Sequence, residues 1–216
     1  MLRMMFVKCA RRSRTMPNYC ENVVLFRSHD SAIINKLHDA VCERRLFGFI
    51  KPEPKHESLD AETQWREEHW GTKHELMWPH VTVEPGLLDN GQWEFEARFE
   101  TAWGPPVELM QFASKLWPDV LVELAYYEPG LAFCGFFDGG EEVGHWQLEG
   151  VDISSEETID KSLEHLPEVL ISRLMLRERF VLDMQYEKHI WQERWERLEE
   201  QKARFDQYEK DAINGI

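Results

Sequence analysis

The sequence has no long apolar run, and basic side chains are scarce in it. No segment approaches the ~20 apolar residues that a helix needs to span a bilayer, so we expect no membrane protein. Lysine and arginine number 25 against 40 aspartates and glutamates, a formal net charge of −15 over 216 residues. A general nucleic-acid-binding protein needs a basic face toward the phosphates, so direct nucleic-acid binding is not expected.

Cysteine is scarce as well. The four cysteines form no CxxC pair, and residues 1–15 lack the long apolar centre of a secretory signal. Free thiols in a reducing cytoplasm are therefore expected. The cysteine spacing does not fit an iron–sulfur cluster, and we predict no cofactor.

The charge divides the chain into three parts. Residues 1–15 are basic and contain no acid, and we predict that they are an extension before a natural start at Met16, or a poorly ordered tail. Residues 16–154 hold 25 acidic and 10 basic side chains, a net charge of −15. Residues 155–216 hold 15 acidic and 10 basic side chains, a mixture typical of solvated helices. We predict a sheet domain over 16–154 and a helical extension over 155–216.

Hydrophobic periodicity predicts the strands of the sheet domain. Alternation is clearest after the turn at Asp89-Asn90-Gly91, where apolar and charged residues alternate from Trp93 to Thr101. This pattern predicts a sheet that is covered on one face only. Pro79 indicates that its strand is either an edge strand or a broken one. Strands are predicted at 20–26, 76–84, 93–101, 121–127, 131–137 and 145–148.

The helices between these strands define the fold class. One helix is predicted after Asp30 or Ser31, and another between Pro106 and Pro118. Residues 44–60 are predicted as a loop, followed by a short helix that Asp60 caps and Gly71 ends. The resulting order, β-α-β-β-α-β with extra strands at its end, predicts an α+β ferredoxin-like fold with helices on one face of an antiparallel sheet.

From Ser155 onward the pattern is helical, and Pro167 separates a short helix from a long one. A helix of about 40 residues is ~60 Å long, so it either packs in part and projects or pairs with a second chain. A homodimer through this helix is therefore one expected assembly. Lys188 and Lys202 interrupt its apolar stripe, which consists of Val181, Met184, Trp191, Trp195, Leu198 and Phe205.

Several short blocks together carry a family resemblance: MPNYCEN at 16–22, WGTK at 70–73, FETAWGPP at 99–106, YEPG at 127–130 and FCG at 133–135. With these blocks, residues 16–150 resemble the YubB-like (Api-type) ferredoxin-fold family of bacterial plasmids and phages. The resemblance implies a ferredoxin-like fold, an origin on a mobile element, and a location in the cytoplasm of a bacterial host. It implies no activity, because the family has no established catalytic residues.

The block Trp70, Gly71, Thr72 and Lys73 places a ring, a flexible glycine, a hydroxyl and an ammonium within four residues. Such a loop can hold a phosphate or a carboxylate. The alternative is structural, with the tryptophan in the core, the glycine as a helix C-cap and the lysine in solvent.

Other candidate residues are weaker. Tyr127 and Glu128, at a turn, and Trp191 and Trp195, one helical turn apart, are candidate partner-binding residues. Cys134 with His145 can be read as a nucleophile and its base, but a buried inert thiol is far commoner. The histidines do not have the spacing of a metal site. We predict neither a catalytic residue nor a metal ligand.

These features favour a non-enzymatic, acidic protein-interaction module over an enzyme. Its partner is expected to be a host protein or a second copy. A sharper hypothesis is that residues 16–154 mimic nucleic acid and occupy a basic cleft of a host protein. The alternative is a small ligand-binding domain or enzyme that uses the loop from Trp70 to Lys73.

Overall fold

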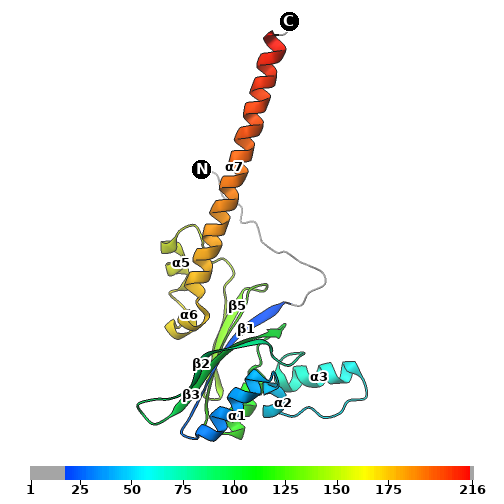
Figure 1. Cartoon of the computed structure of the whole chain (residues 1–216), viewed down its shortest axis with the longest axis vertical. Coiled ribbons are helices and arrows are strands. Elements are labelled where there is room, and N and C mark those ends of the chain that lie inside the picture. Colours follow the sequence, from blue (N-terminus) through cyan, green and yellow to red (C-terminus); the bar gives the residue numbers. More distant parts are fainter. Residues whose placement is uncertain (1–17, 215–216) are drawn as a thin grey trace. The chain divides into compact units, whose positions relative to one another are not determined.

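The computed structural model describes residues 18–214 (Figure 1). The chain divides into two compact units, residues 1–149 and 150–216. The predicted extension over 1–15 lies outside the described residues.

The first unit contains one antiparallel sheet of six strands in the order β2-β3-β1-β4-β5-β6. The order β2-β3-β1-β4 is that of a ferredoxin-like sheet, and β5 and β6 extend it beyond β4. The predicted α+β ferredoxin-like fold is confirmed. The strands are β1 (Tyr19–Ser28), β2 (Met77–Leu87), β3 (Trp93–Ala102), β4 (Leu121–Glu128), β5 (Phe133–Asp138) and β6 (Glu141–Gln147).

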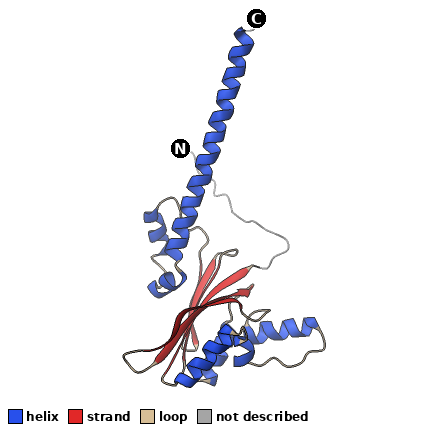
Figure 2. Ribbon diagram, in the orientation of Figure 1, coloured by secondary structure: helices blue, strands red, loops and turns tan. Residues whose placement is uncertain are grey.

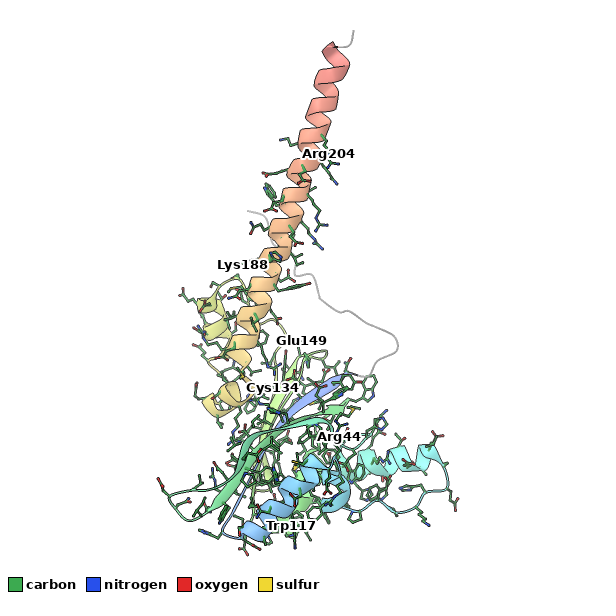
Figure 3. The ribbon with its side chains drawn as sticks, viewed as in Figure 1. Arg44, Trp117, Cys134, Glu149, Lys188 and Arg204 are labelled. Atoms are coloured by element: carbon green, nitrogen blue, oxygen red, sulfur yellow. The ribbon has the colours of Figure 1, made fainter. Side chains whose placement is uncertain are left out.

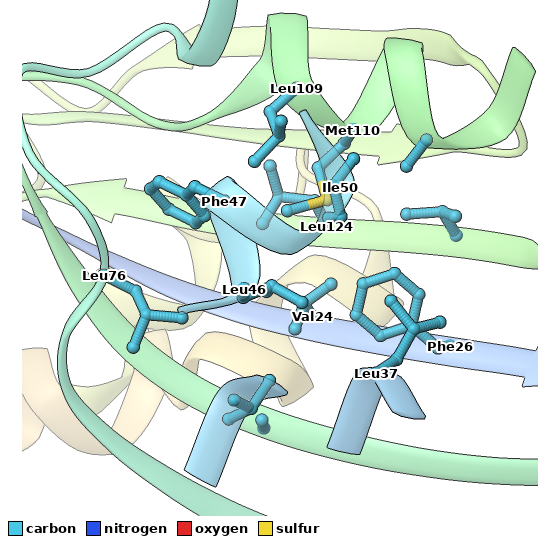
Figure 4. Close-up of a cluster of buried hydrophobic side chains, with 14 of the residues drawn as sticks. Val24, Phe26, Leu37, Leu46, Phe47, Ile50, Leu76, Leu109, Met110 and Leu124 are labelled. Atoms are coloured by element: carbon cyan, nitrogen blue, oxygen red, sulfur yellow. The ribbon is translucent and has the colours of Figure 1, made fainter. Parts of the chain in front are cut away.

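Four helices of this unit lie on one face of the sheet (Figure 2). Their apolar residues meet the inward side chains of the central strands, such as Val24 and Phe26 (Figure 4). The rings of Phe26 and Phe95, from the neighbouring strands β1 and β3, stack at 5.4 Å between centroids. The helices are α1 (Ser31–Cys42), α2 (Leu46–Ile50), α3 (Leu59–Trp70) and α4 (Val107–Leu116).

The prediction of a loop over 44–60 was wrong in its first half, because α2 forms there. Its sequence LFGFI has no capping side chain, and three of its five residues are buried. The carboxylate of Glu75 accepts the backbone N–H groups of Phe47 and Gly48, which are donors that the first turn of a helix leaves unpaired. The cap of α3 also differs from the prediction, since Ser58 rather than Asp60 accepts the N–H of Ala61.

The expectation of a sheet covered on one face holds for β3, where buried and half-buried residues alternate. It was wrong for β1, where both inward Val24 and outward Val23 are buried, and for β4, where Leu124 to Glu128 are all buried. A strand buried on both faces reads as a continuous apolar run instead of an alternation, and both strands have such runs.

The second unit consists of helices α5 (Glu156–Leu163), α6 (Glu168–Leu174) and α7 (Leu176–Asn214). Ser155 and Thr158 form a capping box at the start of α5, where the helical pattern was predicted to begin. The long helix predicted after Pro167 is two helices, because Met175 adopts a left-handed backbone with φ of 53° between α6 and α7. The described helices include none that is long and apolar enough to cross a membrane.

Candidate functional site

The face of the sheet opposite α1–α4 is rich in carboxylates. Side chains alternate along each strand, so the residues that flank the inward core positions share this face. We call it the charged sheet face and define it by eight charged residues of four strands: Glu21 and Arg27 of β1, Glu94, Glu96, Arg98 and Glu100 of β3, Glu123 of β4, and Asp138 of β5.

The strand register brings like charges together on this face. Glu21 lies directly opposite Glu100 between β1 and β3, and Glu123 lies opposite Asp138 between β4 and β5. Directly opposed like charges destabilise a sheet. Arg27 and Glu94, by contrast, are opposite charges that form a salt bridge, with 2.6 Å between Nη2 and Oε2. The face therefore carries an excess of negative charge.

A pocket of about 100 Å³ opens beside the Glu21–Glu100 pair. Trp78 of β2 forms one wall, with 57% of its surface exposed and with φ of 46°. The ring of Tyr19 meets the Trp78 ring edge-on at 5.2 Å. Asn22, Val23, Arg98 and Phe99 also line the pocket. The pocket thus combines two carboxylates, the guanidinium of Arg98 and an exposed aromatic ring, so carboxylates still outnumber cations in its lining.

Burial raises the pKa of Glu100 above its ordinary value, and the charge of Glu21 raises it further. A carboxylate whose charged form is disfavoured gains from a nearby cation. Aromatic rings attract cations as well. The chemistry of this pocket therefore suits a protonated amine or a guanidinium.

The contacts of the block from Trp70 to Lys73 are those that its structural alternative predicts. Trp70 is buried and donates its Nε1–H to the carbonyl of Lys51, while Gly71 is the left-handed C-cap of α3. Thr72 is buried and donates to the carbonyl of Ala102. Lys73 is half-buried, and its Nζ atom lies 3.3 Å from the Glu67 carboxylate.

The other predicted residues are divided between the two units. Tyr127 of β4 lies directly opposite Glu21 of β1 in the strand register. It therefore neighbours a residue that lines the pocket. Glu128 is only 1% exposed and accepts the backbone N–H groups of Gly130 and Leu131, which fixes the turn. Trp191 and Trp195 lie on α7 in the second unit, 56% and 65% exposed.

The structure does not bring Cys134 and His145 together. Cys134 of β5, labelled in Figure 3, is buried, and burial raises its pKa to about 12. It lies opposite Trp146, so the next residue along, His145, faces the other side of the sheet. There, the Nδ1 atom of His145 lies 3.1 Å from the Tyr126 hydroxyl, which donates to Glu142. Within residues 18–214, no group of three His, Cys, Asp or Glu side chains could hold a metal ion.

Sequence reasoning missed the pocket itself. Glu21 and Trp78 stand in different strands, and only the pairing of β1 and β2 with β3 brings them together. One signal was available: Trp78 is a large aromatic residue next to Pro79, in a strand already predicted to be an edge strand or a broken one.

Residues 88–163 match a protein-family model described as the ferredoxin-like domain in Api92-like protein. The matched segment begins just before β3 and ends with α5. The chain matches no curated protein and no solved structure. The fold and the family match thus define a ferredoxin-like α+β domain similar to that of Api92-like proteins.

Proposed function

We propose that this protein is a non-enzymatic interaction module whose charged sheet face binds a basic segment of a protein partner. The carrying observation is the opposed pair Glu21 and Glu100 beside the exposed ring of Trp78. A lysine or arginine side chain placed there would join Arg98 in neutralising the two carboxylates and would gain about 0.5–1 kcal/mol from the ring.

The charge of the whole unit supports the same kind of partner. Residues 16–154 carry 25 acidic and 10 basic side chains, and such a field accelerates the approach of a basic protein and weakens as salt rises. In the sharper form of the proposal, this surface mimics nucleic acid and occupies the basic cleft of a bacterial host protein in the cytoplasm. The resemblance to a plasmid and phage family supports an origin on a mobile element.

The proposal includes self-association through α7. Two copies joined there would present two charged sheet faces, and a partner with two basic segments would bind them with increased avidity. Trp191 and Trp195, both exposed on α7, support this part of the proposal.

The test uses the full chain and a fluorescein-labelled poly-arginine peptide, with binding measured by fluorescence anisotropy at low and high salt. The variant Glu21→Gln/Glu100→Gln removes two charges at the pocket. The matched control, Glu57→Gln/Glu149→Gln, removes two charges from exposed positions outside the charged sheet face. Exposed ion pairs contribute ~0.2–1 kcal/mol each, so we expect the pocket variant to bind about two- to thirtyfold more weakly.

We expect the control to bind nearly as well as the unchanged chain. An equal loss in both variants would show that net charge alone attracts the peptide, and the charged sheet face would then have no specific role. Binding that is insensitive to salt, or no binding at all, would contradict the proposal as a whole.

A further inference from the structure

The second half of α7 exposes large apolar side chains along a helix that its own unit does not cover. Met184 is the last buried residue of the described part of α7. Beyond it, Trp191, Trp195 and Leu198 are between 56% and 65% exposed. Helices in water draw most of their stability from packing an apolar face, so this stretch requires a partner.

The spacing of these residues identifies the kind of partner. With Met184 at position d of a heptad, Trp191 and Leu198 are also at d, and Trp195 is at a. Positions a and d face the partner helix in a two-stranded coiled coil. Met184 is already buried within the chain, so the exposed seam begins after it, and the remaining a positions there are Lys188 and Lys202. We infer that α7 pairs with α7 of a second copy as a parallel, in-register coiled coil, an inference that rests on the proposed self-association.

Charge complementarity supports a second copy of α7 as the partner, and a parallel orientation pairs Arg194 with Glu199. In a parallel pair, the residue at position g of one helix meets position e of the other, five residues further along. Arg194 is at g and Glu199 is at e, so each helix supplies both members of this ion pair. In an antiparallel pair, g positions meet g positions, so Arg194 would pair with Glu187 of the second helix and Glu199 would lose Arg194 as its partner.

Both side chains already lie at the edge of the stripe. The Arg194 guanidinium lies 5.8 Å from the centre of the Trp191 ring. The Glu199 carboxylate accepts the indole N–H of Trp195 at 2.9 Å.

The two lysines restrict this pairing. A lysine at an a position fixes register and oligomer state at a cost in stability. Because Lys188 and Lys202 occupy two a positions among the apolar ones, a third helix packed into the same core would bury still more charge. A weak dimer is therefore expected rather than a larger bundle.

The first experiment measures the mass of the full chain by sedimentation equilibrium over a range of concentrations. We expect the mass to rise with concentration toward twice the 25.7 kDa of one chain. The variant Leu198→Glu places a charge in the seam and should raise the dimer dissociation constant about tenfold or more. The matched control is Leu182→Glu, because Leu182 is equally exposed at 63% and occupies a b position outside the seam.

The second experiment tests orientation by exchanging charges. Arg194→Glu should weaken the dimer, and Arg194→Glu/Glu199→Arg should restore it, because the exchanged pair meets again in a parallel dimer. If the unchanged chain stays a monomer at every concentration, the proposed self-association and this inference both fail. If it dimerises but the exchange restores nothing, self-association stands and the parallel register is overturned. Equal weakening by Leu182→Glu and Leu198→Glu would remove the seam from the interface.

Discussion

Glu21 of β1 and Glu100 of β3 are directly opposite each other in the strand register, and both carboxylates line the same pocket. Burial, and then the charge of Glu21, raises the pKa of Glu100. Such a pair costs stability in the free protein. A bound cation would reduce the repulsion between the two carboxylates. The proposed function therefore predicts that binding stabilises the sheet.

Glu100→Gln should therefore stabilise the free chain. Removal of one opposed charge is expected to raise the free energy of unfolding at pH 7 by about 0.2–1 kcal/mol. Chemical denaturation of the variant and the unchanged chain measures this difference. Glu57→Gln, at an exposed position outside the charged sheet face, should leave the free energy of unfolding nearly unchanged.

The same pair predicts a pH dependence. Because the pKa of Glu100 is raised above its ordinary value of 4.5, the folded chain binds a proton more readily than the unfolded chain does. The contribution of Glu100 to stability is therefore favourable at low pH and falls as pH rises through the window above 4.5. The advantage of Glu100→Gln should shrink as pH falls below that window. A constant advantage across the whole pH range would contradict this account.

Gly135→Ala should disturb the sheet next to Tyr126. A Cβ atom at position 135 would lie 2.1 Å from the phenol ring of Tyr126, which lies directly opposite in the register of β4 and β5. Overpacking of this kind costs about 1–3 kcal/mol. Gly86→Ala, also in a strand, meets its nearest atom at an ordinary 3.6 Å, so its effect should be within about 0.5 kcal/mol.

A double-mutant cycle separates this clash from a general effect of alanine in the strand. In a Tyr126→Leu background, the cost of Gly135→Ala in denaturant unfolding should fall, because the ring that blocks the new methyl group is gone. Equal costs in the two backgrounds would show that Tyr126 is not the obstacle.

Patterns within short segments of the sequence predicted the strands and turns that depend on neighbouring residues. The alternation from Trp93 to Thr101 identified β3, and the Asn90-Gly91 turn placed β2 beside it. Helix α2 escaped prediction because it is five residues long and its N–H groups bond to Glu75, which is 28 positions from Phe47 in sequence.

The candidate site was less predictable for the same reason. Its members Tyr19, Trp78 and Glu100 come from three strands, and no spacing within one strand signals their meeting. The residues singled out from sequence were adjacent ones, such as Trp70 and Thr72. In the structure, these two are buried, and their polar atoms donate to backbone carbonyls.

The three described cysteines should differ in reactivity toward a thiol reagent. Cys42 is exposed, whereas Cys20 and Cys134 are buried. In a Cys9→Ser chain, which removes the one cysteine outside the described residues, only Cys42 should react before unfolding. Burial and the charge of Glu84 raise the Cys42 pKa above its ordinary value of 9.0, so its rate should still be rising with pH at pH 9. Reaction of two thiols in the folded chain would contradict the burial of Cys20 or Cys134.

Glu75→Gln should destabilise the first unit although it changes almost no volume. One oxygen of Glu75 accepts the N–H groups of Phe47 and Leu76, and the other accepts that of Gly48. The amide nitrogen of glutamine is a donor, so at least one of these buried N–H groups would lose its acceptor, at a cost of about 1–3 kcal/mol. Denaturant unfolding should show this loss for Glu75→Gln and nearly none for Glu57→Gln. If the two variants were equally stable, the carboxylate would not be what holds α2 in place.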